Sequence, residues 1–204
     1  NDGNGNFVDI SAGLIGIAGR SVAWGDYDND GDLDLVVAGD TGSGYTNIIY
    51  RNDGNGNFVD ISAGLVGVVS GSVAWGDYDN DGDLDLVVAG WDGSQRITKI
   101  YRNDGATNFV DISAGLIGVE SCSVAWGDYD NDGDLDLVVT GKDTLFSRIT
   151  KIYRNDGATN FVDISAGLVG VEWCSVAWGD YDNDGDLDLV VAGDEGSDPI
   201  TKIY

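Results

Sequence analysis

The stretch Asp26–Asp34, DYDNDGDLD, places five carboxylates within nine residues. Like charges at this density repel one another, at a cost on the order of 1 kcal/mol for each close pair even with the screening of water. A bound cation would remove that repulsion, so the stretch predicts a metal site, and a solvated acidic turn is the alternative. The same nine letters recur at 77–85, 128–136 and 180–188.

The alternation of the acidic residues indicates which oxygens can reach a cation. Asp26, Asp28 and Asp30 can turn their carboxylates toward one centre, and the glycine that follows permits a sharp turn around the ion. We expect Asp32 to contribute its backbone carbonyl and Asp34 to close the shell. Hard oxygen ligands in a flexible loop suit Ca²⁺ better than Mg²⁺, which keeps more of its water. The candidate ligands are Asp26, Asp28, Asp30, Asp32 and Asp34, then Asp77, Asp79, Asp81, Asp83 and Asp85, then Asp128, Asp130, Asp132, Asp134 and Asp136, then Asp180, Asp182, Asp184, Asp186 and Asp188.

The acidic stretch is the centre of a longer repeat, SVAWGDYDNDGDLDLVV, which occurs four times at intervals of 51 or 52 residues. No linker separates the repeats, so we expect one domain over residues 1–204 rather than four independent units. The sequence repeats are 1–51, 52–102, 103–154 and 155–204.

Each repeat reads as four short strands. SVAWGD (21–26) alternates between two faces, and LDLVVAG (33–39) is apolar and β-branched. IIYR (48–51) and NFVDIS (6–11) complete the set, with Asn-Asp-Gly turn residues before the last. No segment has the 3.6-residue period of a helix. Four strands in each period of roughly 50 residues indicate a propeller blade, so the predicted fold class is all-β, a β-propeller with four four-stranded blades per chain.

The repeat resembles the FG-GAP/VCBS family, the blades of integrin-α-like calcium-binding propellers. The shared pattern is an apolar strand with its Trp, then D-x-D-x-D-G-x-x-D, then a second apolar strand, and all four repeats carry it. The resemblance implies the β-hairpin form of the calcium site. It also implies an extracellular or cell-surface module for adhesion or ligand recognition.

The order of the strands predicts how chains associate. If the Trp strand is innermost, the first blade begins near Ser21 and takes NFVDIS at 57–62 as its outer strand. The fourth blade then has three strands, and the strand at Asn6–Ser11 has no blade of its own. Its pairing with Ile200–Tyr204 would close a four-bladed ring in one chain, join two chains in an eight-bladed ring, or build a filament. We expect the homo-oligomer, because a ring of four wide blades is tightly curved.

Composition excludes several classes of partner. The net charge of −26 and a pI near 4.1 argue against binding to nucleic acid or to an anionic membrane surface. No apolar run is long enough to span a bilayer, so we expect no membrane insertion. Hydrophobic residues make up 42% of the chain, which argues against disorder. The chain has no Met, so we expect it to be processed or part of something longer.

Catalysis has little support in the residues. The chain has no His, which removes the commonest general base and the usual Ser or Cys triad. Close carboxylate pairs occur only inside the acidic stretches, where they are expected to be metal ligands. We therefore expect a protein that is not an enzyme, and a propeller enzyme with a calcium-bound water as base is the alternative.

Two windows differ between the repeats, at 15–20 and 40–47 in the first repeat and at the equivalent positions of the others. In a four-stranded meander both windows lie at the end of the blade opposite the acidic loops. We interpret this end as a recognition face for a protein or glycan ligand, with neutral drift in exposed loops as the alternative. A self-assembling structural unit of a surface layer or fibre is the alternative function. The candidate ligand-binding residues are Trp91, Arg96, Phe146, Arg148 and Trp173, the last of which could instead pack between blades.

Cys122 and Cys174 occupy equivalent positions in neighbouring repeats, just before the innermost strand. A disulfide between crowded inner strands is conceivable, and two free, partly buried thiols are the alternative. The pair does not decide the redox compartment.

Overall fold

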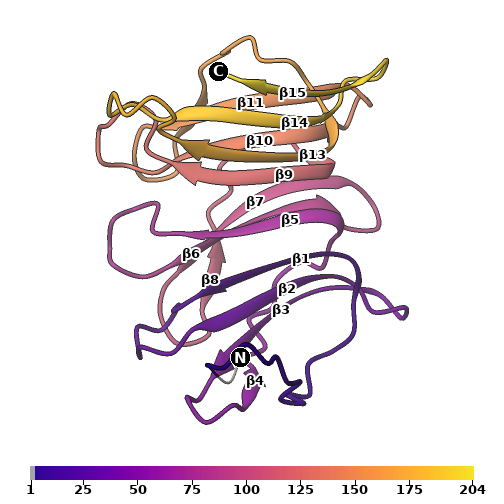
Figure 1. The fold of residues 1–204 in the computed structure, drawn as a ribbon, viewed down its shortest axis with the longest axis vertical. Helices are drawn as coiled ribbons and strands as arrows, with labels where there is room; N and C mark the ends of the chain where they lie inside the picture. The colour runs from indigo at the N-terminus through magenta and orange to yellow at the C-terminus, as the bar shows by residue number, and fades with distance from the viewer. Residues whose placement is uncertain (1–2) are drawn as a thin grey trace.

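The computed structural model describes residues 3–204 as an all-β protein of fifteen strands, with no helix among these residues. No helix in this range is therefore long and apolar enough to cross a membrane. The strands form antiparallel sheets that follow one another from the N-terminal to the C-terminal end of the molecule, and the two termini lie at opposite ends (Figure 1).

The sheets are built from one repeated up-and-down meander, which we call a blade. Blade 1 joins β1 (Ala18–Gly25), β2 (Asp34–Asp40), β3 (Tyr45–Asn52) and β4 (Phe58–Asp60) in that order. The expected offset is confirmed, because the blade takes its outer strand from the next sequence repeat. Blade 2 contains β5 (Val69–Gly76), β6 (Asp85–Trp91), β7 (Arg96–Asn103) and β8 (Phe109–Asp111); blade 3 contains β9 (Val119–Gly127), β10 (Asp136–Asp143), β11 (Arg148–Asn155) and β12 (Phe161–Asp163); blade 4 contains β13 (Glu172–Gly179), β14 (Asp188–Asp194) and β15 (Pro199–Ile203).

The second strand of each blade forms the core. In β2 and β6 the residues from Asp34 to Gly39 and from Asp85 to Gly90 are buried on both faces, which explains a continuous apolar run instead of an alternating one. Val36, Val87 and Val138 are fully buried, and each lies in a hydrophobic cluster that includes residues of a neighbouring blade. The interior is therefore continuous along the row of blades.

Blades 2 and 3 form one eight-stranded sheet because a single residue pair, Ile97 with Val119, joins β7 to β9. Equivalent bridges join Thr46 to Val68 and Ile149 to Val171. The chain passes so close to the third strand here that a Cβ on Gly118 would lie 2.0 Å from the carbonyl oxygen of Arg96. Only glycine fits this crossing, and it lets each blade cross over to the next.

Neighbouring blades are joined by an aromatic contact. The ring of Tyr27, in the acidic loop of blade 1, stacks on Trp75 of blade 2 at 6.3 Å and packs against Phe109 at 5.8 Å. Tyr78, Trp126 and Phe161 repeat these contacts between blades 2 and 3, with the same distances. Offset and tilted aromatic pairs at such separations stabilise beyond the area they bury.

Hydrogen bonds accompany each aromatic contact. The indole Nε1 of Trp75 donates to the carbonyl oxygen of Ala23 at 3.3 Å, and the Val73 amide donates to Ser21 Oγ at 3.2 Å. The same two bonds recur one blade further along, in each of the next two junctions. We call this set of aromatic and hydrogen-bonding contacts the blade junction.

The strand expected at Asn6–Ser11 is not formed within the chain. Phe7, Val8 and Ile10 are 83%, 72% and 67% exposed, and residues 6–11 have no strand assignment. Within residues 3–204 no closed four-bladed ring is formed, and the first and last blades lie apart (Figure 1).

The expected partner of this segment is Ile200–Tyr204 of another chain. The outer strand of blade 1 pairs only with the last three residues of β3, beginning with Tyr50 opposite Asp60. Tyr50 corresponds to Tyr204 in blade 4, and the Ile61 amide donates to the carbonyl of Ile49, which corresponds to Ile203. Pairing of Asn6–Ser11 with Ile200–Tyr204 of another chain stays a prediction.

The blade junction predicts the effect of removing its tryptophan. Trp126→Ala deletes the stack on Tyr78 and the bond to Ala74, and we expect it to lower the free energy of unfolding by about 3 kcal/mol. Trp173→Ala is the matched control, because Trp173 is 73% exposed, and we expect a change within about 0.5 kcal/mol. Urea denaturation followed by circular dichroism measures both. Equal losses for the two variants would contradict the assignment.

Candidate metal centres and ligand-binding surfaces

The acidic loop connects the first and second strands of every blade. Asn29 and Gly31 have positive φ values of 57° and 94°, and together they turn the chain back toward β2. The amides of Asp30 and Gly31 both donate to the Asp26 carboxylate, at 3.1 Å each, so this side chain organises the turn. The Asn-Asp-Gly sequence of the loop suits these conformations, since Asn and Gly tolerate the left-handed region.

Three carboxylates converge inside each loop. Ligand oxygens of Asp26, Asp28 and Asp34 lie within 4.8 Å of one another. The other three loops hold the same triad at Asp77, Asp79 and Asp85, at Asp128, Asp130 and Asp136, and at Asp180, Asp182 and Asp188.

The last carboxylate of the triad is anchored from both sides. Asp34 is fully buried, and its Oδ2 accepts from the Tyr27 amide at 3.1 Å while its Oδ1 accepts from the Asn52 amide at 2.8 Å. Asp85 makes the same two bonds, to the amides of Tyr78 and Asn103. This residue therefore links the acidic loop to the end of the third strand.

The middle carboxylate of the triad is the one whose bonding is incomplete. Oδ1 of Asp28 and Oδ1 of Asp79 are buried and have no hydrogen-bond partner among the described residues. A buried carboxylate oxygen without a donor is costly unless a cation satisfies it. The donor set, three oxygens of hard character, fits Ca²⁺, and the triad would supply the side-chain ligands.

The pKa values of the loop report the same crowding. Burial raises the pKa of Asp28, and the neighbouring charge of Asp30 raises it further. Burial raises the pKa of Asp85 to about 7 and that of Asp136 to about 6, against the hydrogen bonds that each accepts from two backbone amides. A cation bound nearby would lower these pKa values, because it favours the charged form of each carboxyl group.

Two of the five candidate ligand residues lie outside each triad. The Asp30 carboxylate accepts from the amide of Asp32 at 2.9 Å. The Asp83 carboxylate accepts from Asn29 Nδ2 of the preceding blade at 2.8 Å, and Asp134 and Asp186 do the same one and two blades further along. The carboxylates of Asp83, Asp134 and Asp186 therefore contribute to the blade junctions. A contribution of Asp30 or of the Asp32 backbone carbonyl to ion binding stays a prediction.

The two variable windows meet at the opposite end of each blade, as expected. The register places Ala18 opposite Asp40 and Glu120 opposite Lys142, whereas Gly25 and Asp34 pair at the acidic end. The recognition-face hypothesis thus concerns one continuous edge of the molecule.

Three of the five candidate ligand-binding residues form a cluster there. The Arg96 guanidinium lies 4.4 Å from the ring centre of Phe146 and 5.8 Å from that of Trp91, and it donates to Glu120 at 2.6 Å. Phe146 remains 66% exposed. The salt bridge with Glu120 holds the Arg96 guanidinium against the face of the Phe146 ring, so this exposed ring has a fixed position.

The other two candidates lie apart from that cluster. Arg148 pairs with Glu172 at 2.5 Å, and Lys142 approaches the same carboxylate at 3.3 Å. Trp173 stands on the bulge at the start of β13 with a φ of 49°, and its 73% exposure shows that it does not pack between blades.

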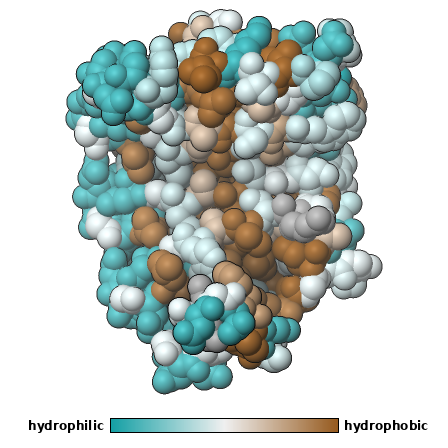
Figure 2. Space-filling model, in the orientation of Figure 1, coloured by the Kyte–Doolittle hydropathy of each residue, from teal (hydrophilic) through white to brown (hydrophobic). Residues whose placement is uncertain are grey.

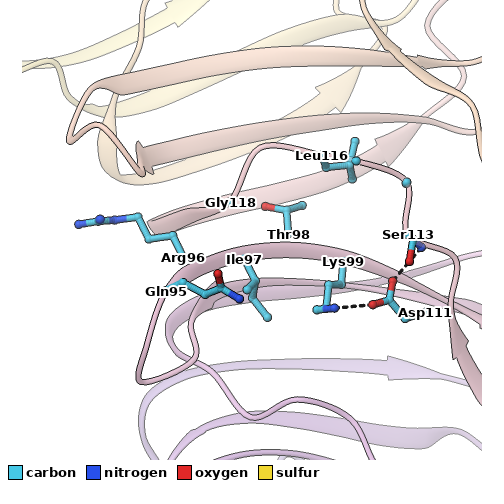
Figure 3. A pocket seen from close by; sticks show the side chains of 11 residues that line it. Gln95, Arg96, Ile97, Thr98, Lys99, Asp111, Ser113, Leu116 and Gly118 are labelled. Atoms are coloured by element: carbon cyan, nitrogen blue, oxygen red, sulfur yellow. Dashed lines mark hydrogen bonds and ion pairs between the residues drawn. The ribbon is translucent and has the colours of Figure 1, made fainter.

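A groove next to the cluster was missed at the sequence level. It has a volume of about 290 Å³ and lies between β7 and the connection 113–118, with Thr98 pointing toward that connection and Lys99 paired with Asp111 (Figure 3). Thr98 Oγ1 is buried and has no hydrogen-bond partner among the described residues. A second groove of about 320 Å³ lies at the same place in blade 3, between β11 and 165–170. Their lining residues are nearly identical between repeats, so comparing the variable windows could not find them.

The two cysteines are free. Cys122 is buried with its Sγ 3.9 Å from the Ser70 carbonyl, and Cys174 donates to the Ser121 carbonyl at 3.5 Å. Burial raises the pKa of both thiols, to about 11 for Cys174. Both therefore act as small packing residues at the junctions.

Comparison with known proteins supports the geometry. The pattern of the FG-GAP-like repeat matches residues 1–37, 26–88, 77–139 and 143–191. The chain belongs to this family. The matches include all four acidic loops, so the resemblance inferred from the repeat is confirmed.

The chain is also similar to cartilage acidic protein 1. It is 27% identical to the Xenopus tropicalis protein over 197 residues and 26% identical to the Mus musculus protein over 199 residues. Each match covers 90% of this chain, but the chain spans only 30% of the length of these relatives.

Among solved structures, an Agrocybe aegerita lectin described as recognising non-reducing terminal N-acetylglucosamine aligns with a TM-score of 0.56. It is 18% identical, and the match covers 98% of this chain and 55% of the lectin chain. This likeness shows a shared fold.

The raised pKa values predict how the cation-free protein responds to pH. Asp85 and Asp136 titrate near 7 and 6 in the folded chain, whereas unfolded aspartate titrates near pH 4. Between these values the folded state binds more protons than the unfolded state, so its stability falls as pH rises. In EDTA we expect the melting temperature to decrease from pH 5 to pH 8. Calcium should flatten this dependence, and a melting temperature in EDTA that rises over this range would contradict it.

The unpartnered middle carboxylate predicts two opposite effects of one substitution. Asp79→Asn removes a buried charge, so we expect it to raise the melting temperature in EDTA and to reduce calcium uptake by one ion per chain. Asp198→Asn, an exposed residue outside the loops, removes the same charge and should change neither quantity. Calorimetric titration and thermal melts measure the pair. An unchanged calcium stoichiometry in Asp79→Asn would refute the site.

Proposed function

We propose that the chain is a non-enzymatic calcium-binding β-propeller module that recognises a ligand through its variable end. Four copies of one carboxylate triad support the calcium part, and the buried unpartnered oxygens of Asp28 and Asp79 support a bound cation over a solvated turn. The ions would neutralise the loops and fix the acidic end of each blade. An extracellular or cell-surface location fits this proposal, because extracellular calcium modules have weak sites that millimolar calcium fills.

The observation that carries ligand recognition is the ordered aromatic cluster at the variable end. Arg96, held by Glu120, fixes Phe146 from a different blade, and the ring is left exposed. Aromatic and arginine side chains in fixed positions are typical anchors of binding surfaces. The adjoining groove adds a hydroxyl from Ser113 and charged groups from Lys99 and Asp111.

A glycan is the ligand class that this arrangement fits best. A groove of about 290 Å³ with a hydroxyl, an ion pair and an adjacent aromatic ring offers both hydrogen bonds and a flat apolar face. The fold shared with a lectin supports the same class. A protein ligand is the alternative, to be tested with the same variants.

A glycan array, probed with and without EDTA, tests the proposal. We expect calcium-dependent binding, including to terminal N-acetylglucosamine, and a loss of tenfold or more on the best hit when Trp91, Arg96, Phe146 and Arg148 are all replaced by Ala. Calcium uptake should stay at the wild-type value, because these residues lie at the end opposite the triads. Val59→Ala, on the outer strand, is the surface control. Undiminished binding by the quadruple variant would reject the recognition face.

A second candidate function is a self-associating structural unit. It is supported by the exposed Phe7, Val8 and Ile10 of the segment 6–11, and by a hydrophobic surface toward the N-terminal end of the molecule (Figure 2). The expected homo-oligomer, with Asn6–Ser11 of one chain beside blade 4 of another, belongs to this proposal. Light scattering of the pure chain tests it, and a mass of one chain would count against it.

A further inference from the structure

The two end faces of the chain are complementary halves of one blade junction, and we propose that they bind each other between two copies of this chain. The C-terminal face of blade 4 would dock on the N-terminal face of blade 1 of a second copy through the contacts that join neighbouring blades inside the chain. This inference gives the self-association proposed above a specific interface, and it does not depend on ligand recognition. The C-terminal face comprises Ser175, Ala177, Gly179, Tyr181 and Asn183, and the N-terminal face comprises Gly16, Val22, Trp24, Asn52 and Phe58.

The aromatic half-contacts are already in position at both ends. Trp24 and Phe58 lie 6.0 Å apart at 59°, close to the 6.1 Å and 54° of Trp75 and Phe109 at an internal junction. There, Tyr27 completes the cluster and is only 3% exposed. At the ends Trp24 is 56% exposed and its counterpart Tyr181 is 68% exposed. Each end face therefore exposes the part of the aromatic cluster that the other end face lacks.

The hydrogen bonds divide in the same way. Asn103 Nδ2 donates to the Leu84 carbonyl within its blade and to the Tyr27 carbonyl of the preceding blade. Among the described residues, the equivalent Asn52 Nδ2 makes only the bond within its blade, to Leu33 at 3.1 Å. By the internal pattern its second acceptor is the carbonyl of Tyr181 in another copy.

Two further donors at the ends follow the same pattern. Asn29 bonds to Gly82 and Asp83 of the next blade, whereas the equivalent Asn183 has no such partner among the described residues. The Trp24 indole likewise has no acceptor among these residues, although each of the other three tryptophans at this position bonds to an alanine carbonyl. Docking the two faces would satisfy both groups.

Glycines at the junctions lie where the neighbouring blade packs most closely. A Cβ on Gly76 or Gly127 would meet the tryptophan ring of the next blade at 2.6 Å, but a Cβ on Gly179 would meet nothing within 4 Å. At the other end, a Cβ on Gly118 would strike the Arg96 carbonyl, and the equivalent Gly16 is likewise open. Gly16 and Gly179 thus leave open the space that a neighbouring blade fills at the internal junctions.

A second copy of this chain offers the matching end faces. Four near-identical repeats mean that the C-terminal face of blade 4 matches the surface that blade 1 presents to blade 2. One chain cannot use both its own ends, because they lie apart (Figure 1). Two chains joined at both ends would form an eight-bladed ring with twofold symmetry, in which no end face remains open.

The end glycines give a direct test that leaves the single chain intact. Gly179→Leu fills space that is open in one chain and would collide with Trp24 of a second copy. We expect the wild-type chain at 100 μM, with calcium, to sediment as an oligomer, and the variant to sediment as one chain with an unchanged circular dichroism spectrum. Thr144→Leu adds the same apolar side chain to an exposed turn and should still assemble. A wild-type chain that stays single, or a Gly179→Leu chain that assembles like wild type, overturns the proposal.

A mixing experiment separates a blocked junction from general damage. Gly16→Leu blocks only the N-terminal face, and Gly179→Leu blocks only the C-terminal face, so each variant alone should stay a single chain. Mixed, the first offers a free C-terminal face and the second a free N-terminal face. Native mass spectrometry should then show one-to-one complexes of the two variants. A mixture in which no mixed complex forms contradicts the head-to-tail junction.

Discussion

One loop supplies two kinds of contact, and the rest of the structure depends on how its residues alternate. In the first repeat Asp26 and Asp28 form the carboxylate triad together with Asp34. The residues between and after them, Tyr27 and Asn29, turn toward the next blade, where they meet Trp75 and Asp83. The side chains that form the carboxylate triad therefore alternate along one loop with those that contact the next blade. Charge repulsion within the triad and packing between the blades both depend on the conformation of this loop.

This coupling gives the acidic end a structural role and leaves the other end free to vary. The Asp34 carboxylate accepts hydrogen bonds from the amides of Tyr27 and Asn52 and so links the loop to the third strand. A shift of Asp34 caused by repulsion in the triad would therefore displace Tyr27, which belongs to the blade junction. The variable windows lie at the far end of each blade, where Trp91 and Phe146 differ from their counterparts in the other repeats while the loop sequences stay the same. Under the proposed function, ligand specificity would change at one end without altering the loops at the other.

Much of this arrangement could be predicted from the sequence, because it is encoded locally. The repeat, the strand order and the acidic loops follow from letters within one period, and residues such as Val36 and Asp34 lie where that pattern places them. What could not be predicted depends on the neighbouring blade. The carboxylate of Asp83 bonds to Asn29 of the blade before it, and Phe7 has no sheet to join within its own chain. The groove beside Thr98 also needs the fold, since it forms where the connection 113–118 crosses β7.

The exchange of the indole hydrogens tests the coupling of loop and junction most directly. Trp75, Trp126 and Trp178 each donate Nε1–H across a junction, so nuclear magnetic resonance can follow their exchange with solvent in calcium and in EDTA. If the loop holds the junction, removing calcium will accelerate exchange at these three indoles together with the amides of Tyr27, Tyr78 and Tyr129. Loss of protection at the loop amides alone, with the three indoles unchanged, would contradict the account.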